Sequence, residues 1–285
     1  MKMTITKLLK MSYEKLSKSG IESYQLDSQI ILANLLEKNR IYLHTNKFDE
    51  VSEKVADKFI ELMDLRSTGY PLQYILGYCE FMGMQFRIEE GVLIPRQDTE
   101  ILALICINKI HEENIKEICD VACGSGIIGI SILKNSKCQS AHMFDISDKA
   151  LELTEINAKK LGVVERSLIF KSDLLNHAIE HNIKYDLIVS NPPYIKTGEI
   201  KNLMKDVRDF EPVQALDGGE DGLSFYRKIT KESLYCLKKN GFLCFEIGYD
   251  ERFDVMNILE ENGFSNIECY KDLGNNDRVV LGRFK

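Results

Sequence analysis

The chain has 285 residues, of which 44% are hydrophobic and 28% are charged, so it is long enough for one large globular domain or two smaller ones. Its formal net charge of −7 excludes a global basic field that would attract nucleic acid or an anionic membrane. The eight cysteines form no C-x-x-C pair, which indicates reduced thiols and favours a cytoplasmic protein over a disulfide-stapled one.

The first part of the chain has helical periodicity. Apolar residues recur at helical spacing around residues 5–16, 30–36 and 51–63, so we expect a small helical-bundle domain over residues 1–75. The pattern then changes to short alternating runs separated by glycines, which predicts a β-hairpin linker over residues 76–100. Neither a secretory signal nor a membrane span is predicted, because no apolar run has the required length.

Strand-like and helix-like stretches alternate over residues 101–285. The candidate strands are EICDVA, SAHMFD, SLIFKS, YDLIVS, GFLCFEI, NIECYKD and RVVLGRF. This alternation predicts an α/β domain whose mostly parallel, seven-stranded sheet is covered by helices on both faces. The short turn at Gly274, Asn275 and Asn276 predicts that the last two strands form an antiparallel pair at one edge.

A glycine-rich loop follows the first of these strands, in DVACGSGIIG. Gly124, Gly126 and Gly129 spell G-x-G-x-x-G, and Asp145 ends the next strand about 20 residues later, as a ribose-binding acid should. A nucleotide-like ligand is therefore favoured over a simple tight turn. Asp120 would repel a pyrophosphate but suits the cationic amino group of S-adenosylmethionine.

Other polar residues near the predicted strand ends have two readings each. Asp145 either caps a helix or binds a ribose, and the nearby Ser147 and Asp148 already supply capping groups, which favours the ribose. Asp173 either caps a turn or contacts an adenine, and its place at a strand end favours the ligand.

HAIEH at residues 177–181 matches the zinc-binding pattern H-x-x-E-H, but no third ligand is evident, so we expect no metal.

The strand YDLIVS runs directly into Asn191, Pro192, Pro193 and Tyr194. Two prolines make this loop stiff, and it lies at the edge where open α/β sheets bind ligands, which disfavours a mere turn. The side-chain oxygen of Asn191 and the carbonyl of Pro192 could accept both N–H bonds of a planar NH2 group and aim its lone pair at an electrophile. Tyr194 could then cover the planar group.

These motifs together resemble the class I S-adenosylmethionine-dependent methyltransferases that modify planar amino nitrogens. VLIPRQDTE, PLQYILGYCEF and ALDGGEDGL make the chain similar to the release factor glutamine methyltransferase family over nearly its whole length. NPPY alone is shared with adenine and guanine amino methyltransferases, whereas its combination with IPRxDTE is much more specific. The resemblance implies methylation of the side-chain amide of the glutamine in the Gly-Gly-Gln motif of peptide chain release factors.

The resemblance also implies residue roles and a domain organisation. A substrate-recognition domain over residues 1–75 and a Rossmann-like methyltransferase domain over residues 101–285 would form a monomer that binds a release factor, without direct contact to nucleic acid or membrane. S-adenosylmethionine would be bound by Asp120, Ala122, Cys123, Gly124, Ser125, Gly126, Asp145, Asp173, Leu174 and Asn191. The substrate glutamine would be bound by Asn191, Pro192, Pro193 and Tyr194, with Asn191, Pro192 and Tyr194 as the catalytic set.

Three positions depart from the family's pattern. Ala122 stands in place of the first glycine of the loop, Gln97 replaces the proline of IPRPDTE, and Leu174 stands where many relatives have an aromatic residue. These changes bear on cofactor affinity and not on the chemistry of transfer.

Three other functions fit parts of the sequence. An amino-nitrogen methyltransferase acting on DNA or RNA bases would share NPPY but should carry a basic recognition surface. A nicotinamide-dependent oxidoreductase would share the glycine pattern, but it explains neither NPPY nor Asp120. A non-catalytic cofactor-binding scaffold would bind cofactor without turnover on any acceptor.

Overall fold

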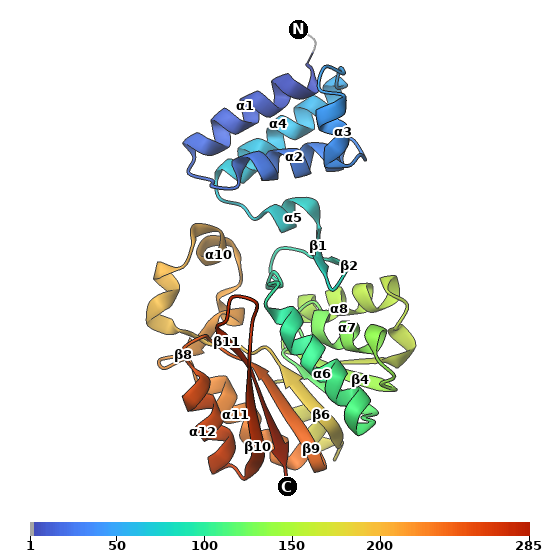
Figure 1. The fold of residues 1–285 in the computed structure, drawn as a ribbon, viewed down its shortest axis with the longest axis vertical. Coiled ribbons are helices and arrows are strands. Elements are labelled where there is room, and N and C mark those ends of the chain that lie inside the picture. The colour runs from blue at the N-terminus through green and yellow to red at the C-terminus, as the bar shows by residue number, and fades with distance from the viewer. Residues whose placement is uncertain (1–2) are drawn as a thin grey trace. The chain divides into compact units, whose positions relative to one another are not determined.

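The computed structural model describes residues 3–285 and divides the chain into two compact units. Unit 1 comprises the chain up to Tyr78 together with Met204–Phe210, and unit 2 comprises Cys79–Leu203 and Glu211–Lys285. Figure 1 follows the chain from the helical N-terminal part, in blue, to the terminal strands, in red.

Unit 1 is a helical bundle, as the apolar periodicity predicted. Its helices are α1 (Ile5–Lys18), α2 (Tyr24–Leu35), α3 (Arg40–Thr45), α4 (Glu53–Ser67), α5 (Leu72–Leu76) and α10 (Lys205–Phe210). Leu8, Leu16 and Phe59 are among the residues of its apolar core. An ion pair also lies inside the bundle, because Arg66 on α4 donates to Asp27 on α2 at 2.8 Å and both side chains are less than a tenth exposed.

Helix α10 belongs to unit 1 although unit 2 flanks it on both sides in the sequence. The ring of Phe210 meets the ring of Tyr70 edge-on, with centroids 5.3 Å apart. The side chain of Lys205 lies beside Gly69. The chain therefore passes between the two units three times.

A two-stranded hairpin follows α5 and lies within the range 76–100 where the sequence predicted a hairpin. It consists of β1 (Tyr78–Phe81) and β2 (Met84–Arg87). The two residues of its turn, Met82 and Gly83, both have positive φ, at 49° and 70°. This backbone matches the type I′ turn that suits the twist of a short hairpin.

The main sheet of unit 2 has seven strands in the order β10-β11-β9-β6-β3-β4-β5. The strands are β3 (Glu117–Val121), β4 (Ser140–Asp145), β5 (Ser167–Lys171), β6 (Tyr185–Ser190), β9 (Leu237–Glu246), β10 (Phe264–Lys271) and β11 (Asp277–Phe284). The five strands from β9 to β5 are parallel, whereas β11 is antiparallel to both β9 and β10. The predicted strands and the antiparallel terminal pair are thus confirmed.

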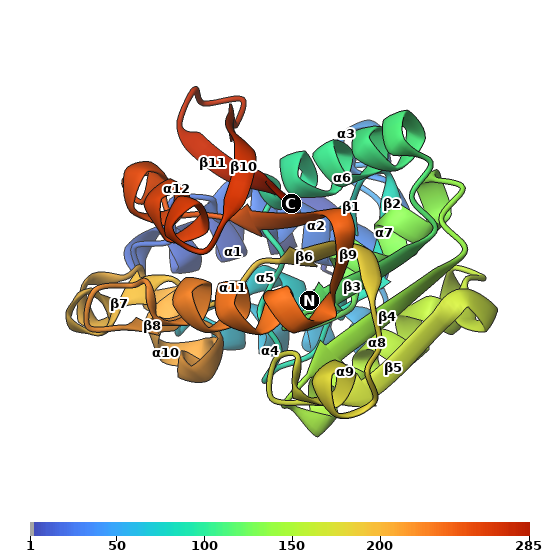
Figure 2. The same cartoon turned by 90° about the horizontal axis from the view of Figure 1, so that it is seen from below.

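Helices cover both faces of this sheet. One face carries α6 (Thr99–Glu113), α7 (Ile127–Asn135) and α8 (Asp148–Lys160), and the other carries α9 (Asn176–Glu180), α11 (Ser224–Cys236) and α12 (Arg252–Glu261), as Figures 1 and 2 show. The remaining short elements are η1 (Val164–Arg166), β7 (Ile195–Lys196), η2 (Thr197–Asn202), η3 (Val213–Ala215) and β8 (Asp217–Gly219). The predicted fold class, an α/β methyltransferase-like domain with a helical N-terminal domain and a hairpin, is confirmed.

The parallel strands place four loops at one edge of the sheet. Strands β3 and β6 are almost entirely buried, which explains why their sequences are nearly continuous runs of apolar residues. Because β3, β4, β5 and β6 all run in the same direction, the loops that follow them meet at their common carboxyl edge. The predicted cofactor and substrate residues lie on these loops, except Asp120 and Asp145, which lie at the ends of β3 and β4.

All eight cysteines are free thiols, and seven of them are buried. Among residues 3–285, the helices include none that is long and apolar enough to cross a membrane.

Candidate active site

A cavity of about 430 Å³ lies at the carboxyl edge of the parallel strands, wholly within unit 2. Its volume is in the range of small-molecule sites. Its walls are the loops after β3, β4, β5 and β6, the segment that precedes α6, the turn around η3 and the start of α11. The cavity therefore joins the glycine-rich loop and the NPPY loop in one site.

The glycine-rich loop turns sharply between β3 and α7. Ala122, Gly124 and Gly126 all have positive φ, at 58°, 57° and 76°. Of the two glycines, only Gly126 has no room for a side chain, because a Cβ there would lie 2.6 Å from the side chain of Thr154. Gly126 thus allows the loop to pack against α8, whereas Ala122 and Gly124 face the cavity.

Side chains of α8 fix the main chain of this loop. Thr154 donates its hydroxyl to the carbonyl of Gly124 at 3.0 Å, and the Asn157 amide donates to the carbonyl of Ser125 at 3.0 Å. Since both donors are fully buried, the loop is held in shape before any ligand arrives.

Asp145 ends β4 with its carboxylate against the glycine-rich loop. Its Oδ2 accepts from the Gly124 N–H and its Oδ1 from the Ser147 N–H, both at 2.9 Å. Burial raises the pKa of this carboxyl, and the main-chain donors oppose that rise. Each oxygen retains a further lone pair, so the carboxylate can still accept hydrogen bonds from the hydroxyls of a ligand.

Asp120, near the end of β3, is completely buried and does not line the cavity. Its Oδ2 accepts from the Gly129 N–H at 2.8 Å, so the carboxylate is directed at the first turns of α7. Its Oδ1 has no hydrogen-bond partner among residues 3–285. Burial raises the pKa of Asp120 to about 7, and the charge of Asp145 adds to that rise.

Asp173 and Leu174 follow β5, and both line the cavity. Leu174 has a φ of 51° and is almost fully buried. The carboxylate of Asp173 pairs with the ammonium of Lys228 on α11, at 2.9 Å. This pair is about half exposed, so it is more suited to orienting a ligand than to stabilising the fold.

Asn191 lies half-buried just after β6, in the wall of the same cavity. Its Nδ2 donates to the hydroxyl of Thr99, the first residue of α6, at 3.4 Å. Pro193 also lines the cavity. The NPPY loop and the start of α6 thus meet at the cavity, although they are far apart in the sequence.

Tyr194 and Pro192 do not line the cavity in the described chain. The ring of Tyr194 packs against the main apolar core, and burial together with the charge of Glu246 raises the pKa of its hydroxyl. Arg278 and Arg96 oppose this rise. The proposed role of Tyr194 as a cover for a planar group therefore remains a proposal.

An ion pair anchors the segment that precedes α6. Arg96 donates to Glu211 at 2.6 Å, and the Ile94 N–H donates to the other carboxylate oxygen at 3.1 Å. Glu211 is 5% exposed and is the residue at which the chain re-enters unit 2. The segment with Val92, Leu93 and Pro95 is thereby held against the cavity, which it lines.

Most of the sequence-predicted residues lie together in the cavity wall. These are Ala122, Cys123, Gly124, Ser125, Asp145, Asp173, Leu174, Asn191 and Pro193, whereas Asp120, Gly126, Pro192 and Tyr194 lie behind it. Sequence reasoning missed Thr99, Phe225 and Lys228, which also line the cavity. The position of Thr99 within IPRQDTE was a usable signal for that residue. Phe225 and Lys228 had none, because they lie on an ordinary amphipathic helix.

The sheet order, the fixed glycine-rich loop and the NPPY loop beside it define an α/β methyltransferase. Residues 7–77 match the family model described as the PrmC N-terminal domain, and residues 96–208 match the methyltransferase small domain. A release factor glutamine methyltransferase of Clostridium botulinum is 46% identical, covering 99% of both chains, and one of Clostridium acetobutylicum is 46% identical, covering 98% of both. The chain belongs to the release factor glutamine methyltransferase family.

Solved structures of other methyltransferases share the fold. A ribosomal protein L11 methylase of Lactobacillus delbrueckii subsp. bulgaricus has a TM-score of 0.50 and 22% identity, over 70% of this chain and 86% of that one. A T. thermophilus 16S rRNA methyltransferase, solved with AdoMet and guanosine, has a TM-score of 0.51 and 13% identity, over 73% of this chain and 50% of that one. At these identities the likeness concerns the fold alone.

Proposed function

We propose that this chain transfers a methyl group from S-adenosylmethionine to the side-chain amide nitrogen of the glutamine in the Gly-Gly-Gln motif of peptide chain release factors. The observation that carries the proposal is the position of Asn191, which lies in the same cavity wall as the glycine-rich loop and Asp145. Membership of the release factor glutamine methyltransferase family supports the choice of substrate.

The residues of the cavity suit S-adenosylmethionine. Asp145 has acceptor capacity for the two hydroxyls of a ribose, and Asp173 with Leu174 provides a polar and an apolar edge for an adenine. The loop from Ala122 to Gly126 would hold the methionine part, with Asp120 supplying negative potential from behind it. When bound, this cofactor would supply a methyl on a positively charged sulfur, so that the carbon–sulfur bond breaks as the nitrogen–carbon bond forms and one amide proton passes to water.

The NPPY loop would select and orient the amide. The NH2 group of a glutamine is planar and weakly nucleophilic, so the protein must fix its direction more than it must remove a proton. The Asn191 side-chain oxygen and the Pro192 carbonyl would accept its two N–H bonds, with Pro193 holding the loop rigid and Tyr194 packing behind it. No general base is required by this arrangement.

The domain roles follow the same proposal. Residues 1–75 would recognise the release factor, residues 76–100 would link the domains and residues 101–285 would carry the methyl transfer. The enzyme would act as a monomer on a protein partner.

Mass spectrometry can test the proposal directly. The chain is incubated with methyl-labelled S-adenosylmethionine and a purified release factor, and the label is located by peptide mapping. We expect one methyl on the Gly-Gly-Gln glutamine. A parallel incubation with RNA and DNA serves as the control, and label found on nucleic acid instead would overturn the assignment.

The variant Asn191→Ala tests the role of the NPPY loop. It should lower the rate of methyl transfer by about 100-fold or more, because the amide loses one of its two fixed acceptors. Cofactor affinity should change little, which isothermal titration with S-adenosylmethionine measures. Asn257→Ala, on the exposed face of α12, is the matched control and should leave both quantities unchanged.

A further inference from the structure

The glycine-rich segment DGGEDG, residues 217–222, packs directly on the main chain of the NPPY loop. A Cβ at Gly218 would lie 2.6 Å from the Cα of Tyr194 and 2.7 Å from its carbonyl carbon. A Cβ at Gly222 would lie 2.6 Å from the carbonyl oxygen of the same tyrosine. Both glycines are buried. Because these two positions lack side chains, residues 217–222 can contact the last residue of NPPY.

Hydrogen bonds join this segment to the strand that follows NPPY. Strand β8, which begins the segment, pairs with β7 in parallel orientation. The Ile195 N–H donates to the carbonyl of Leu216 at 3.0 Å. The Oδ1 atom of Asp217 accepts from the hydroxyl of Thr197 at 2.7 Å and from the N–H of Gly219 at 2.9 Å. The segment is therefore bonded to the chain on the C-terminal side of NPPY as well as packed against it.

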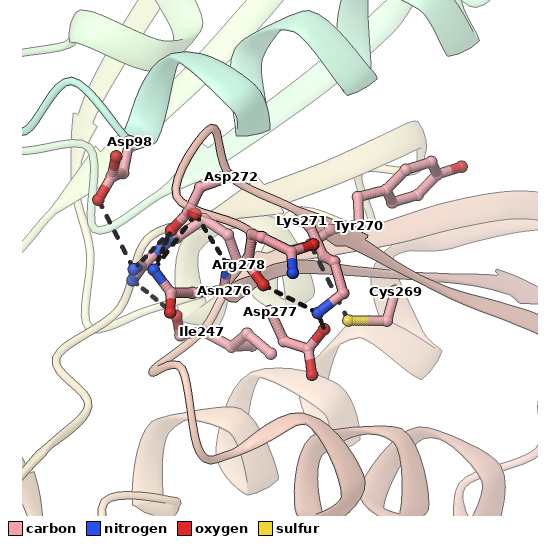
Figure 3. Close-up of polar contacts among 10 residues, drawn as sticks. Asp98, Ile247, Cys269, Tyr270, Lys271, Asp272, Asn276, Asp277 and Arg278 are labelled. Atoms are coloured by element: carbon pink, nitrogen blue, oxygen red, sulfur yellow. Dashed lines mark hydrogen bonds and ion pairs between the residues drawn. The ribbon is translucent and has the colours of Figure 1, made fainter.

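Gly222 also packs against a buried carboxylate that is fixed by its own contacts. A Cβ at Gly222 would lie 2.6 Å from Oε1 of Glu251, a residue that is 4% exposed. The other oxygen, Oε2, accepts from the Gly248 N–H at 2.9 Å. The residue before this glycine is Ile247, and its carbonyl accepts from the guanidinium of Arg278 on β11 at 3.2 Å, as Figure 3 shows. The terminal hairpin thus holds the loop that supports Gly222.

The main chain connects Tyr194 stiffly to the carbonyl of Pro192, which is one of the two proposed acceptors. The two peptide bonds between them are planar, and the ring of Pro193 fixes its own φ. The ψ of Pro193 is then the one soft torsion between the Tyr194 Cα and the Pro192 carbonyl. A displacement of the Tyr194 main chain is therefore passed on to the acceptor.

We infer that Gly218 and Gly222 are positioning residues, which set the place of the Pro192 carbonyl in the active site through their contact with the main chain of Tyr194. This inference rests on the proposed function, since it concerns the same methyl transfer. Residues 217–222 do not line the cavity, so the two glycines act through the NPPY loop and not by contact with cofactor or substrate.

The variant Gly218→Ala tests the inference. A contact between two carbon atoms is ordinarily about 3.5–4.0 Å long, so the added Cβ must displace the main chain of Tyr194 or its own by about 1 Å. We expect kcat on the release factor to fall by about 10- to 100-fold, because reacting groups tolerate little misplacement. The dissociation constant for S-adenosylmethionine, measured by titration, should stay within about threefold, because the change affects the orientation of the amide and not the cofactor site.

The matched control is Gly241→Ala on β9. Gly241 is buried like Gly218, and both lie outside the set of glycines with positive φ. A Cβ at Gly241 would also meet main chain, at 2.9 Å from the carbonyl oxygen of Lys238 and 3.0 Å from that of Asp186. Asp186 is at the start of β6, whereas NPPY follows the end of that strand. Gly241→Ala should therefore lower the unfolding midpoint but leave kcat within about twofold of wild type.

A second pair of variants loosens the segment without adding atoms, so it decides the question even if Gly218→Ala does not fold. Asp217→Ala removes the acceptor for Thr197 and Gly219 and should lower kcat by about 3- to 10-fold. Asp217→Asn keeps an oxygen for both donors and should restore most of the rate.

Three results would overturn the inference. These are a kcat of Gly218→Ala that equals that of wild type or of Gly241→Ala, a kcat of Asp217→Ala that equals that of wild type, and equal losses for Asp217→Ala and Asp217→Asn. A wild-type chain that methylates no release factor would overturn the proposed function instead, so the two failures are distinguishable.

Discussion

Replacing Asp120 with asparagine should make the stability of unit 2 less dependent on pH. Burial raises the pKa of Asp120 to about 7, from its ordinary value of 3.8. The folded protein therefore holds this proton at pH values where the unfolded chain has lost it. The resulting stabilisation is full below about pH 4 and is lost as the pH rises through 7.

The size of the effect follows from the same shift. When the pH falls from about 8.5 to about 5.5, it ends about 1.5 pH units below the pKa that Asp120 has in the folded protein. Each of these units adds about 1.4 kcal/mol to the free energy of unfolding, because Asp120 stays ionised in the unfolded chain over this range. Asp120 should thus stabilise the fold by about 2 kcal/mol more at the lower pH. The asparagine of the variant does not titrate but keeps an oxygen for the Gly129 N–H, so the difference between variant and wild type should change by that amount.

Hydrogen exchange measured by mass spectrometry on peptides of β3 and α7 gives the stability of unit 2 separately from that of unit 1. Asp186→Asn is the matched control. Main-chain and Lys238 hydrogen bonds lower the pKa of Asp186, so it stays ionised in both states over this pH range. A difference between Asp120→Asn and wild type that is the same at both pH values would refute the reasoning.

Three further substitutions probe the backbone and the helical unit. Ala122→Gly should raise the unfolding free energy of unit 2 by about 1 kcal/mol, because the φ of 58° at Ala122 is strained for a residue with a Cβ. Hydrogen exchange in β3 measures the change, and an unchanged stability would show that the backbone is not strained there. Gly126→Ala should destabilise unit 2 by at least about 2 kcal/mol more than the control Gly162→Ala, because both glycines have positive φ but only a Cβ at Gly126 would clash. Equal denaturation midpoints for the two variants would contradict this. Arg66→Ala should destabilise unit 1 by about 3–5 kcal/mol, because it leaves the carboxylate of Asp27 buried without its partner. Hydrogen exchange in α2 and α4 measures this loss, and a loss below about 1 kcal/mol would show that the ion pair is dispensable.

The sequence was informative where the signal is local. Strand and helix stretches, the short turn before β11 and the glycine-rich loop are each defined by neighbouring residues, so the sheet and the cavity edge could be predicted. The position of Asn191 after a buried strand placed it at that edge by the same logic. Family resemblance supplied the substrate, which no local pattern encodes.

The sequence was uninformative where distant residues meet. Thr99 and Asn191 are 92 positions apart, and the contact between them depends on where α6 begins relative to β6. Asp120 illustrates a different limit, because its type suited a cationic ligand but its carboxylate is directed at the Gly129 N–H. The side-chain direction of a strand-end residue depends on the packing of the following helix, which residue type does not reveal.

The assignment of α10 to unit 1 has a consequence for how the two units could be exchanged between relatives. A chimaera that took only the first 78 residues from another member of the family would combine foreign helices with the native α10. Phe210 would then pack against whatever residue the other protein has in place of Tyr70. The helical unit is thus encoded in two places, because its second segment begins at Met204, 125 residues after unit 2 begins at Cys79. Recombination that respects the fold must move two separate pieces of the gene together.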